Sequence, residues 1–204
     1  YKGTNGAILI TTKRGKYNTK SINFTYDHVV NFQSRRPEFV DAATYAEAVN
    51  EARGYEGLGA RYQPGEIKAY RTGAYPYLYP NIDWMDETFR DQSVSNKYTI
   101  QFQGGGNKFR YYTMVDLLTD KGFIKNPNEN EGYSTQNKYS RANLRTNLDI
   151  DLTSTTKLKL NLLGTLAESS RPGASVNLWD LIYSLPASAF PVRTEDNVWG
   201  GNNT

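Results

Sequence analysis

Hydrophobic and polar residues alternate strictly between positions 141 and 152. One set of alternate positions is apolar apart from a single threonine: Ala142, Leu144, Thr146, Leu148, Ile150 and Leu152. The other set is entirely charged or amide-bearing: Arg141, Asn143, Arg145, Asn147, Asp149 and Asp151. Because successive side chains of a strand point to opposite faces, this pattern predicts a β-strand whose two faces meet different surroundings. It is also long enough to cross a bilayer at a tilt, which takes roughly 9–11 residues.

Four more stretches alternate in the same way, so the chain is predicted to contain about five strands. Their expected bounds are 20–32, 97–103, 107–118, 138–152 and 156–167. Short breaks join the second strand to the third and the fourth to the fifth, which is typical of hairpins. The other connections, 33–96, 120–137 and 169–204, are long. Antiparallel strands alternate in direction, so the short turns share one end and the long loops the other, as in outer-membrane barrels.

The long connections carry helix signals of their own. Asp41 is placed to cap a helix that ends before Gly54. Pro64 and Gly73 are placed at the start and the end of a second helix. Asn177 is placed to cap a third, with an apolar face behind it. We expect these helices to lie in extracellular loops.

Composition removes several classes of protein. The chain has 204 residues, no cysteine and a net charge of +3. The absence of cysteine excludes disulfide scaffolds, thiol catalysis and cysteine-ligated zinc within this sequence. So small a charge imbalance does not favour a nucleic-acid partner. No apolar run is long enough for a transmembrane helix, whereas the alternating strands of a transmembrane barrel need no such run.

Candidate catalytic and metal-binding groups are better accounted for by structural roles. Asp83, Asp86 and Glu87 are placed as the start of a short helix rather than as a glycosidase pair. The oxygen-rich stretch 126–132 resembles the beginning of a calcium loop, but its glycine is one place late and the closing glutamate is replaced. His28 is the only histidine, and it lies midway along a predicted strand. We therefore expect no enzyme active site, no metal and no cofactor.

The first sixteen residues resemble a known family. Asn5-Gly6 precedes the apolar stretch Ala7 to Ile10, and Thr11-Thr12-Lys13-Arg14-Gly15 follows it. This order resembles the end of the plug domain in SusC-like TonB-dependent outer-membrane transporters (the SusC/RagA family). Segments 37–48, 81–87, 111–122 and 139–149 resemble later parts of the family in the same order.

The resemblance implies an all-β fold: part of a transmembrane antiparallel β-barrel, with the last plug strand and helical extracellular loops. Residues 1–16 would end the plug domain, and residues 17–204 would begin the barrel, so we expect an internal piece of a longer protein. The implied location is the outer membrane of a Gram-negative bacterium, in contact with its lipid. The implied activity is TonB-dependent import of oligosaccharides or peptides, with a SusD-like surface lipoprotein as partner.

Aromatic residues in the loops are the candidates for substrate contact, because flat rings suit sugar rings and peptide side chains. They are Tyr75, Tyr77, Tyr79, Trp84, Trp179 and Trp199. Packing within the loops, or an interfacial aromatic belt, would also account for rings at these positions. Two further functions stay open: a soluble carbohydrate-binding β-domain of a secreted glycan-degrading protein, and a passive porin. The sorted loops and the plug-like motif favour the transporter.

Overall fold

The structure, a computed structural model, describes most of the chain. The described residues are 11–128, 132, 134–173 and 177–201. The predicted plug strand 7–10, its preceding turn and part of the oxygen-rich stretch 126–132 lie outside them. The chain forms two compact units: Tyr1–Asn31, Ser93–Gly122 and Gln136–Arg171 make the first, and Phe32–Gln92, Phe123–Thr135 and Pro172–Thr204 make the second.

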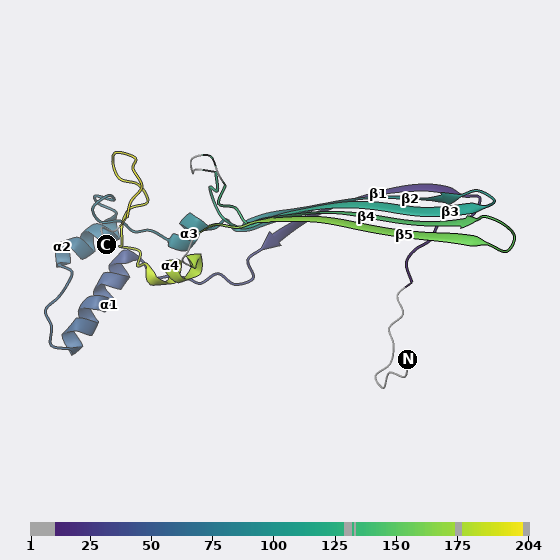
Figure 1. Cartoon of the computed structure of the whole chain (residues 1–204). Coiled ribbons are helices and arrows are strands. Elements are labelled where there is room, and N and C mark those ends of the chain that lie inside the picture. The colour runs from purple at the N-terminus through teal and green to yellow at the C-terminus, as the bar shows by residue number, and fades with distance from the viewer. Residues whose placement is uncertain (1–10, 129–131, 133, 174–176, 202–204) are drawn as a thin grey trace, which may run out of the picture. The chain divides into compact units, whose positions relative to one another are not determined.

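The first unit is a five-stranded sheet in which the strands lie side by side in sequence order (Figure 1). The strands are β1 (Lys20–Phe32), β2 (Gln92–Gly105), β3 (Phe109–Lys121), β4 (Lys138–Asp151) and β5 (Lys157–Ser170). From β2 to β5 each strand is antiparallel to the next. β1 is also antiparallel to β2. The backbone N–H of Gly105, at the end of β2, donates to the carbonyl of Thr19, just before β1, and the side chain of Asn31, near the end of β1, donates to Ser95 near the start of β2. The expected antiparallel sheet is confirmed.

The connections are sorted by length, as the sequence predicts. Residues 106–108 join β2 to β3, and residues 152–156 join β4 to β5. Both turns lie at the same end of the sheet (Figure 1). In the second turn, the backbone N–H of Leu152 donates to the carbonyl of Thr156 at 2.9 Å. The chain leaves the other end of the sheet only through long segments.

One face of the sheet is a continuous apolar band. Leu148 lies between Tyr111 on β3 and Leu160 on β5 in the strand register. Along β4 and the first residue after it, the band runs from Ala142 to Leu152, about 33 Å at roughly 3.3 Å per residue. A barrel strand tilted by about 40° would make this band about 25 Å tall, which is the height of the apolar belt of outer-membrane barrels.

Aromatic pairs mark both edges of the apolar band. Tyr26 of β1 stacks on Tyr98 of β2 at the long-loop edge, with ring centroids 4.9 Å apart. Phe109 and Tyr111 of β3 lie 6.5 Å apart at the short-turn edge. Rings that are apolar in body and polar at one end suit the boundary between hydrocarbon and water. The positions of these pairs match the two aromatic girdles of a transmembrane barrel.

The opposite face of the sheet is polar and internally hydrogen-bonded. Asn143 donates to both oxygens of Asp116 at 3.0 and 3.1 Å, and Thr165 donates to Asn143 at 2.8 Å. This row crosses β3, β4 and β5 in one line. Near the short-turn end, Asn147 and Asp149 are buried. Burial of such residues requires that another segment cover this face.

The second unit carries four helices. They are α1 (Ala42–Tyr55), α2 (Pro64–Thr72), α3 (Trp84–Thr88) and α4 (Leu178–Ser184). Asp41 caps α1 by accepting from the backbone N–H of Thr44 at 2.7 Å, a bond that lowers the pKa of its carboxyl group. The predicted end of this helix is wrong: Gly54 lies inside α1, and Gly57, with φ of 72°, is the left-handed residue beyond it. A glycine inside a helix costs only about 1 kcal/mol, so α1 continues past it.

The other helix signals are confirmed. Gly73 ends α2 in the left-handed conformation, and Asn177 caps α4. Asp83 accepts from the backbone N–H groups of Met85 and Asp86, so the acidic stretch is a helix start as expected. None of the described helices is both long and apolar enough to cross a membrane.

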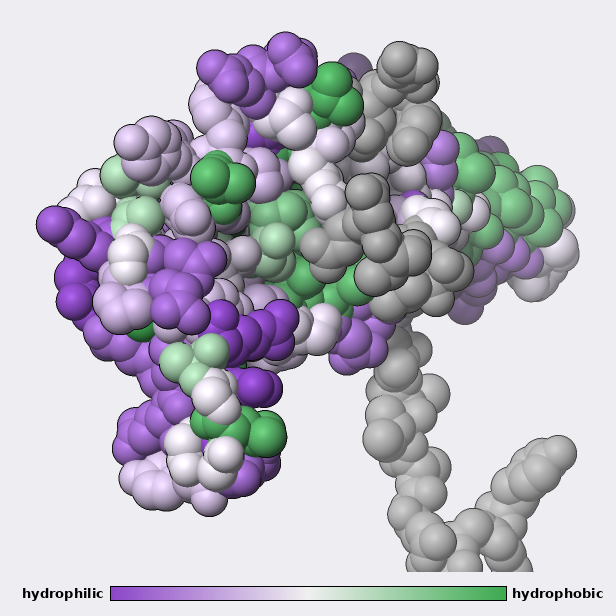
Figure 2. Space-filling model, turned by 90° about the vertical axis from the view of Figure 1, so that its left-hand side faces the viewer, coloured by the Kyte–Doolittle hydropathy of each residue, from purple (hydrophilic) through white to green (hydrophobic). Residues whose placement is uncertain are grey.

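Two small apolar cores hold the second unit together. The first joins Ala42, Ala43, Tyr70 and Ala187, and the second joins Met85, Phe89, Ile124 and Ile182. Arg90, next to Phe89, strengthens the second core by donating two hydrogen bonds to the carbonyl of Ile124, at 2.8 and 3.1 Å. Figure 2 shows that the surface of this unit is mostly hydrophilic, with hydrophobic patches between. The long loops therefore fold together, because each core takes residues from more than one loop.

Replacement of Leu148 by arginine tests which face meets lipid. Leu148 lies near the middle of the apolar band, so the Leu148→Arg variant of the complete barrel should be about 2–4 kcal/mol less stable. Unfolding in denaturant after reconstitution into lipid vesicles measures the change. The matched control is Asn161→Arg on the polar face of β5, which should cost far less. A larger loss from the control would reverse the assignment of the faces.

Short epitope tags test the sorting of the connections. Tags placed after Ala60 or Asn128, in the long segments, should be labelled by antibody on intact cells. Tags placed after Asn107 or Ser154, in the short turns, should be labelled only after the outer membrane is permeabilised. Equal labelling of all four sites on intact cells would contradict the topology.

Candidate functional site

The end of the plug-like motif lies on the polar face of the sheet. Asn147 of β4 donates to the backbone carbonyl of Lys13 at 2.7 Å and to the hydroxyl of Thr12 at 3.2 Å. Arg14 forms an ion pair with Asp149. These contacts join residues more than 130 positions apart in the chain. We call this contact region, formed by residues 12–17 and the polar residues of β3 and β4, the anchor.

Asp149 is the electrostatic centre of the anchor. Its side chain is only 7% exposed and accepts from Arg14 on one side and from Arg110 of β3, at 2.8 Å, on the other. A buried carboxylate is stable only when its partners satisfy it, and removing a partner typically costs about 3–5 kcal/mol. The two guanidinium groups meet this need from separate parts of the chain. The Arg14–Asp149 ion pair therefore holds the N-terminal segment to the sheet, and the Arg110–Asp149 pair lies within the sheet.

Tyr17 adds a further contact to the anchor. Its hydroxyl donates to Asp151 at 2.8 Å, and this bond is the main cause that raises the pKa of the Tyr17 phenol. The guanidinium of Arg110 also lies over the Tyr17 ring, 5.3 Å from its centroid. Arg110 thus contacts both Asp149 of β4 and Tyr17 of the N-terminal segment, and it links the two.

Three glycines allow the segment to pass close to the sheet. A Cβ atom on Gly15 would lie 2.6 Å from the carbonyl oxygen of Gly104 and would also overlap the backbone of Tyr111. A Cβ atom on Gly104 would lie 2.6 Å from the carbonyl of Thr19, and one on Gly105 2.9 Å from that of Lys16. Side chains at these positions would separate the two backbones.

The role of this glycine run was missed from the sequence. The run 104–106 predicts only a turn, but Gly104 and Gly105 belong to β2, and the turn is residues 106–108. A turn needs fewer glycines than the three in this run. The extra glycines were the one sign in the sequence that another segment passes close to the backbone here. The glycines alone could not show that residues 15–19 are the segment that passes there.

The six aromatic candidates for substrate contact occupy different surroundings. Tyr75 and Tyr77 share one turn and are exposed, Tyr75 at 73%. Tyr79 packs edge-on against Tyr70 with centroids 5.4 Å apart. The indole of Trp84 donates to the carbonyl of Pro186 at 3.0 Å and packs beside the second core. Tyr79 and Trp84 therefore have structural roles in the loops.

The last two candidates lie on partly exposed surfaces. Trp179 of α4 stacks on Phe89 with centroids 4.8 Å apart and keeps its outer surface exposed. Trp199 is 53% exposed, and the guanidinium of Arg193 lies 3.9 Å from its ring centroid. Trp84 and Trp179 thus lie around the same core, whereas the six residues do not form one binding surface within the described part of the chain.

Comparison with known proteins identifies relatives over most of the chain, although no family model matches it. The chain is 25% identical over 177 residues to TonB-dependent receptor P3 of Formosa agariphila, which is 85% of this chain and 14% of the receptor. It is 26% identical over 129 residues to TonB-dependent receptor SusC of Bacteroides thetaiotaomicron, which is 62% of this chain and 11% of SusC. The chain thus spans less than a fifth of the length of these two relatives.

The fold also matches a solved transporter. A TM-score of 0.59 relates the chain to the RagAB peptide importer in its closed-closed state, over 92% of this chain and 22% of the solved one. The sequence identity in this match is 15%, so the match concerns the fold alone.

These findings define the chain in two steps. The five-stranded antiparallel sheet, with its apolar band and its anchored N-terminal segment, has the fold of the barrel wall in TonB-dependent transporters. Within that class, the expected resemblance to SusC-like receptors is confirmed. The relatives are receptors and transporters, not enzymes.

The close approach at Gly15 gives a test of the anchor. In the complete receptor, Gly15→Ala should weaken attachment of residues 12–17 by about 1–3 kcal/mol, the usual cost of overpacking. Protease cleavage within this segment should become faster. Gly164→Ala on β5 is the matched control, because a Cβ atom there meets nothing within 4 Å. Equal protection of the variant and the native protein would show that the close approach is not needed.

Proposed function

We propose that this chain forms the end of the plug and the start of the barrel in a receptor that imports nutrients across the outer membrane of a Gram-negative bacterium. The observation that carries the proposal is the anchor. Residues 12–17 include the end of the plug-like motif and are bound to the polar face of a sheet whose other face is an apolar band. A plug inside a barrel requires this arrangement, with the lumen on the polar side and lipid on the apolar side.

The anchor also suits energy-coupled import. A force applied by TonB to the plug can rearrange it only if one end of the plug is held. Asp149, with its two arginine partners, supplies a buried charged attachment, and the glycines supply a close backbone fit. TonB would act on parts of the receptor other than this chain.

The expected partner is a SusD-like surface lipoprotein, and the substrate class is oligosaccharide or peptide. Support comes from the similarity to SusC and to the fold of the RagAB peptide importer. Tyr75, Tyr77, Trp179 and Trp199 are the better placed substrate contacts because their rings have exposed surface. Tyr79 and Trp84 would contribute mainly by holding the loops in shape.

Uptake in the native bacterium tests the proposal. Cells with the complete receptor should take up the oligosaccharide or peptide that it serves, and loss of TonB should reduce uptake to the level of cells without the receptor. Labelled oligosaccharides and peptides, compared in parallel, distinguish the two substrate classes. Restoring TonB on a plasmid is the control. Full uptake without TonB would contradict coupled import and favour a passive porin.

A further inference from the structure

On β3 and β4 the apolar band ends in a polar row and then in a pair of lysines, whereas β1 keeps the exposed Val30 and Phe32 on this face. Beyond the Tyr26–Tyr98 pair, the next row on the same face includes Thr119 and Ser140, and Lys121 and Lys138 follow one row further. Lys121 and Lys138 lie directly opposite each other in neighbouring strands, and both are exposed. The register thus places two ammonium groups side by side just beyond the apolar band.

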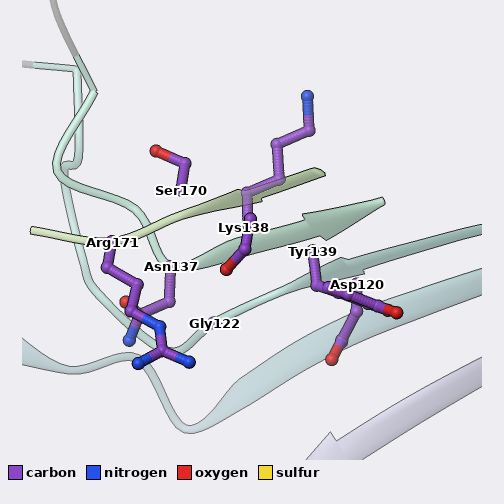
Figure 3. A pocket seen from close by; sticks show the side chains of 8 residues that line it. Asp120, Gly122, Asn137, Lys138, Tyr139, Ser170 and Arg171 are labelled. Atoms are coloured by element: carbon purple, nitrogen blue, oxygen red, sulfur yellow. The ribbon is translucent and has the colours of Figure 1, made fainter. Parts of the chain in front are cut away.

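The lysines lie on the membrane-facing side of the sheet. Lys121 lies four residues from Leu117, and Lys138 lies four residues from Ala142. Because side chains alternate between faces, both lysines lie on the same face as the apolar band. Figure 3 shows the side chains of Lys138 and Ser170 on one side of the strands and those of Asp120 and Arg171 on the other. The hollow at the strand ends is lined mainly by residues of the opposite face, among them Asp120, Tyr139 and Arg171, and it is not part of the lysine pair's surface. The lysines are about 13 Å along the strand beyond Leu117 and Ala142, where the band ends on β3 and β4, roughly at the level of lipid headgroups.

Like charges directly opposite each other destabilise an antiparallel pair. Among the described residues, no ion pair includes either lysine. Glu168 is the acidic residue on this face nearest in register, but it lies opposite Ser140, one row away. Asp120 points to the other face and accepts from Ser95 at 2.6 Å. The pair therefore presents positive charge outward, which a bridging anion would neutralise.

The neighbouring polar groups suit a sugar-bearing anion. Ser170 lies opposite Lys138, and Ser140 and Thr119 provide hydroxyl groups one row nearer the apolar band. On the adjacent strands, His28 and Asn96 form a hydrogen-bonded pair, 2.7 Å apart, in that same row. Lysine ammonium groups bind phosphate as point charges, and hydroxyl, amide and imidazole groups bond sugar hydroxyls.

We propose that Lys121 and Lys138 bind a phosphate group of a phosphorylated glycolipid in the outer leaflet of the membrane. The lipid source is favoured over free phosphate because the pair faces the bilayer and lies just beyond the aromatic pair that marks its edge. Basic side chains at this level attract anionic lipid headgroups. The site goes beyond nutrient import, since it depends on the barrel crossing the membrane and not on any transported substrate.

Glycolipid retained by the purified complete receptor tests the site. The double variant Lys121→Gln/Lys138→Gln should retain roughly tenfold less phosphorylated glycolipid than the native protein after detergent washing. Mass spectrometry of the extracted lipid measures the amount. Lys97→Gln, on the polar face of β2, is the matched control and should retain the native amount. Equal heat-resistant migration of all variants on gels verifies that the barrel is folded.

Two outcomes would overturn the proposal. Native glycolipid retention by the double variant would remove the lysines from the site. Displacement of the lipid by inorganic phosphate at an equal concentration would show that free phosphate, and not the lipid, is the ligand. Retention that survives inorganic phosphate and falls in the double variant alone supports the proposal.

Discussion

The requirement that backbone N–H and C=O groups be paired where no water is present governs this structure. In hydrocarbon each unpaired backbone group costs several kcal/mol, so strands can cross a membrane only as part of a closed hydrogen-bonded ladder. Long antiparallel strands joined by short turns at one end satisfy this requirement and use few residues in the connections at that end. β1 and β5 each have a neighbour on one side only among the described strands. In a membrane their free edges need further strands of the same barrel.

The same requirement explains why each strand has two different faces. Once the backbone is paired, side chains alone meet the surroundings, and alternate positions meet lipid or lumen. Asn147 and Asp149 illustrate the lumen side, because their polar groups are buried under a segment that supplies partners. The loops obey a different rule, since they are held by two apolar cores that they share.

The sequence predicted what depends on local pattern. All five strands follow from alternation, and helix caps such as Asp41 and Gly73 follow from local hydrogen bonding and backbone conformation. β2 begins at Gln92, earlier than predicted, because its first residues are polar and carry no clear alternation. The pairing of Arg14 with Asp149 depends on distant parts of the chain meeting, and no local pattern encodes it. For the same reason, the sequence could not separate exposed Tyr75 from packed Tyr79.

The crossing of Gly15 over Gly104 has a consequence for how this protein can evolve. Most tight contacts tolerate change because a larger residue on one side can be offset by a smaller residue on the other. Here the atoms in the way belong to the backbone, that of Gly104 and Tyr111 for Gly15 and that of Thr19 for Gly104, so no second side-chain substitution can create space. A side chain at either position requires one backbone to move. Descendants of this sequence are therefore expected to keep both glycines together, or to replace the whole crossing by a different path of the chain.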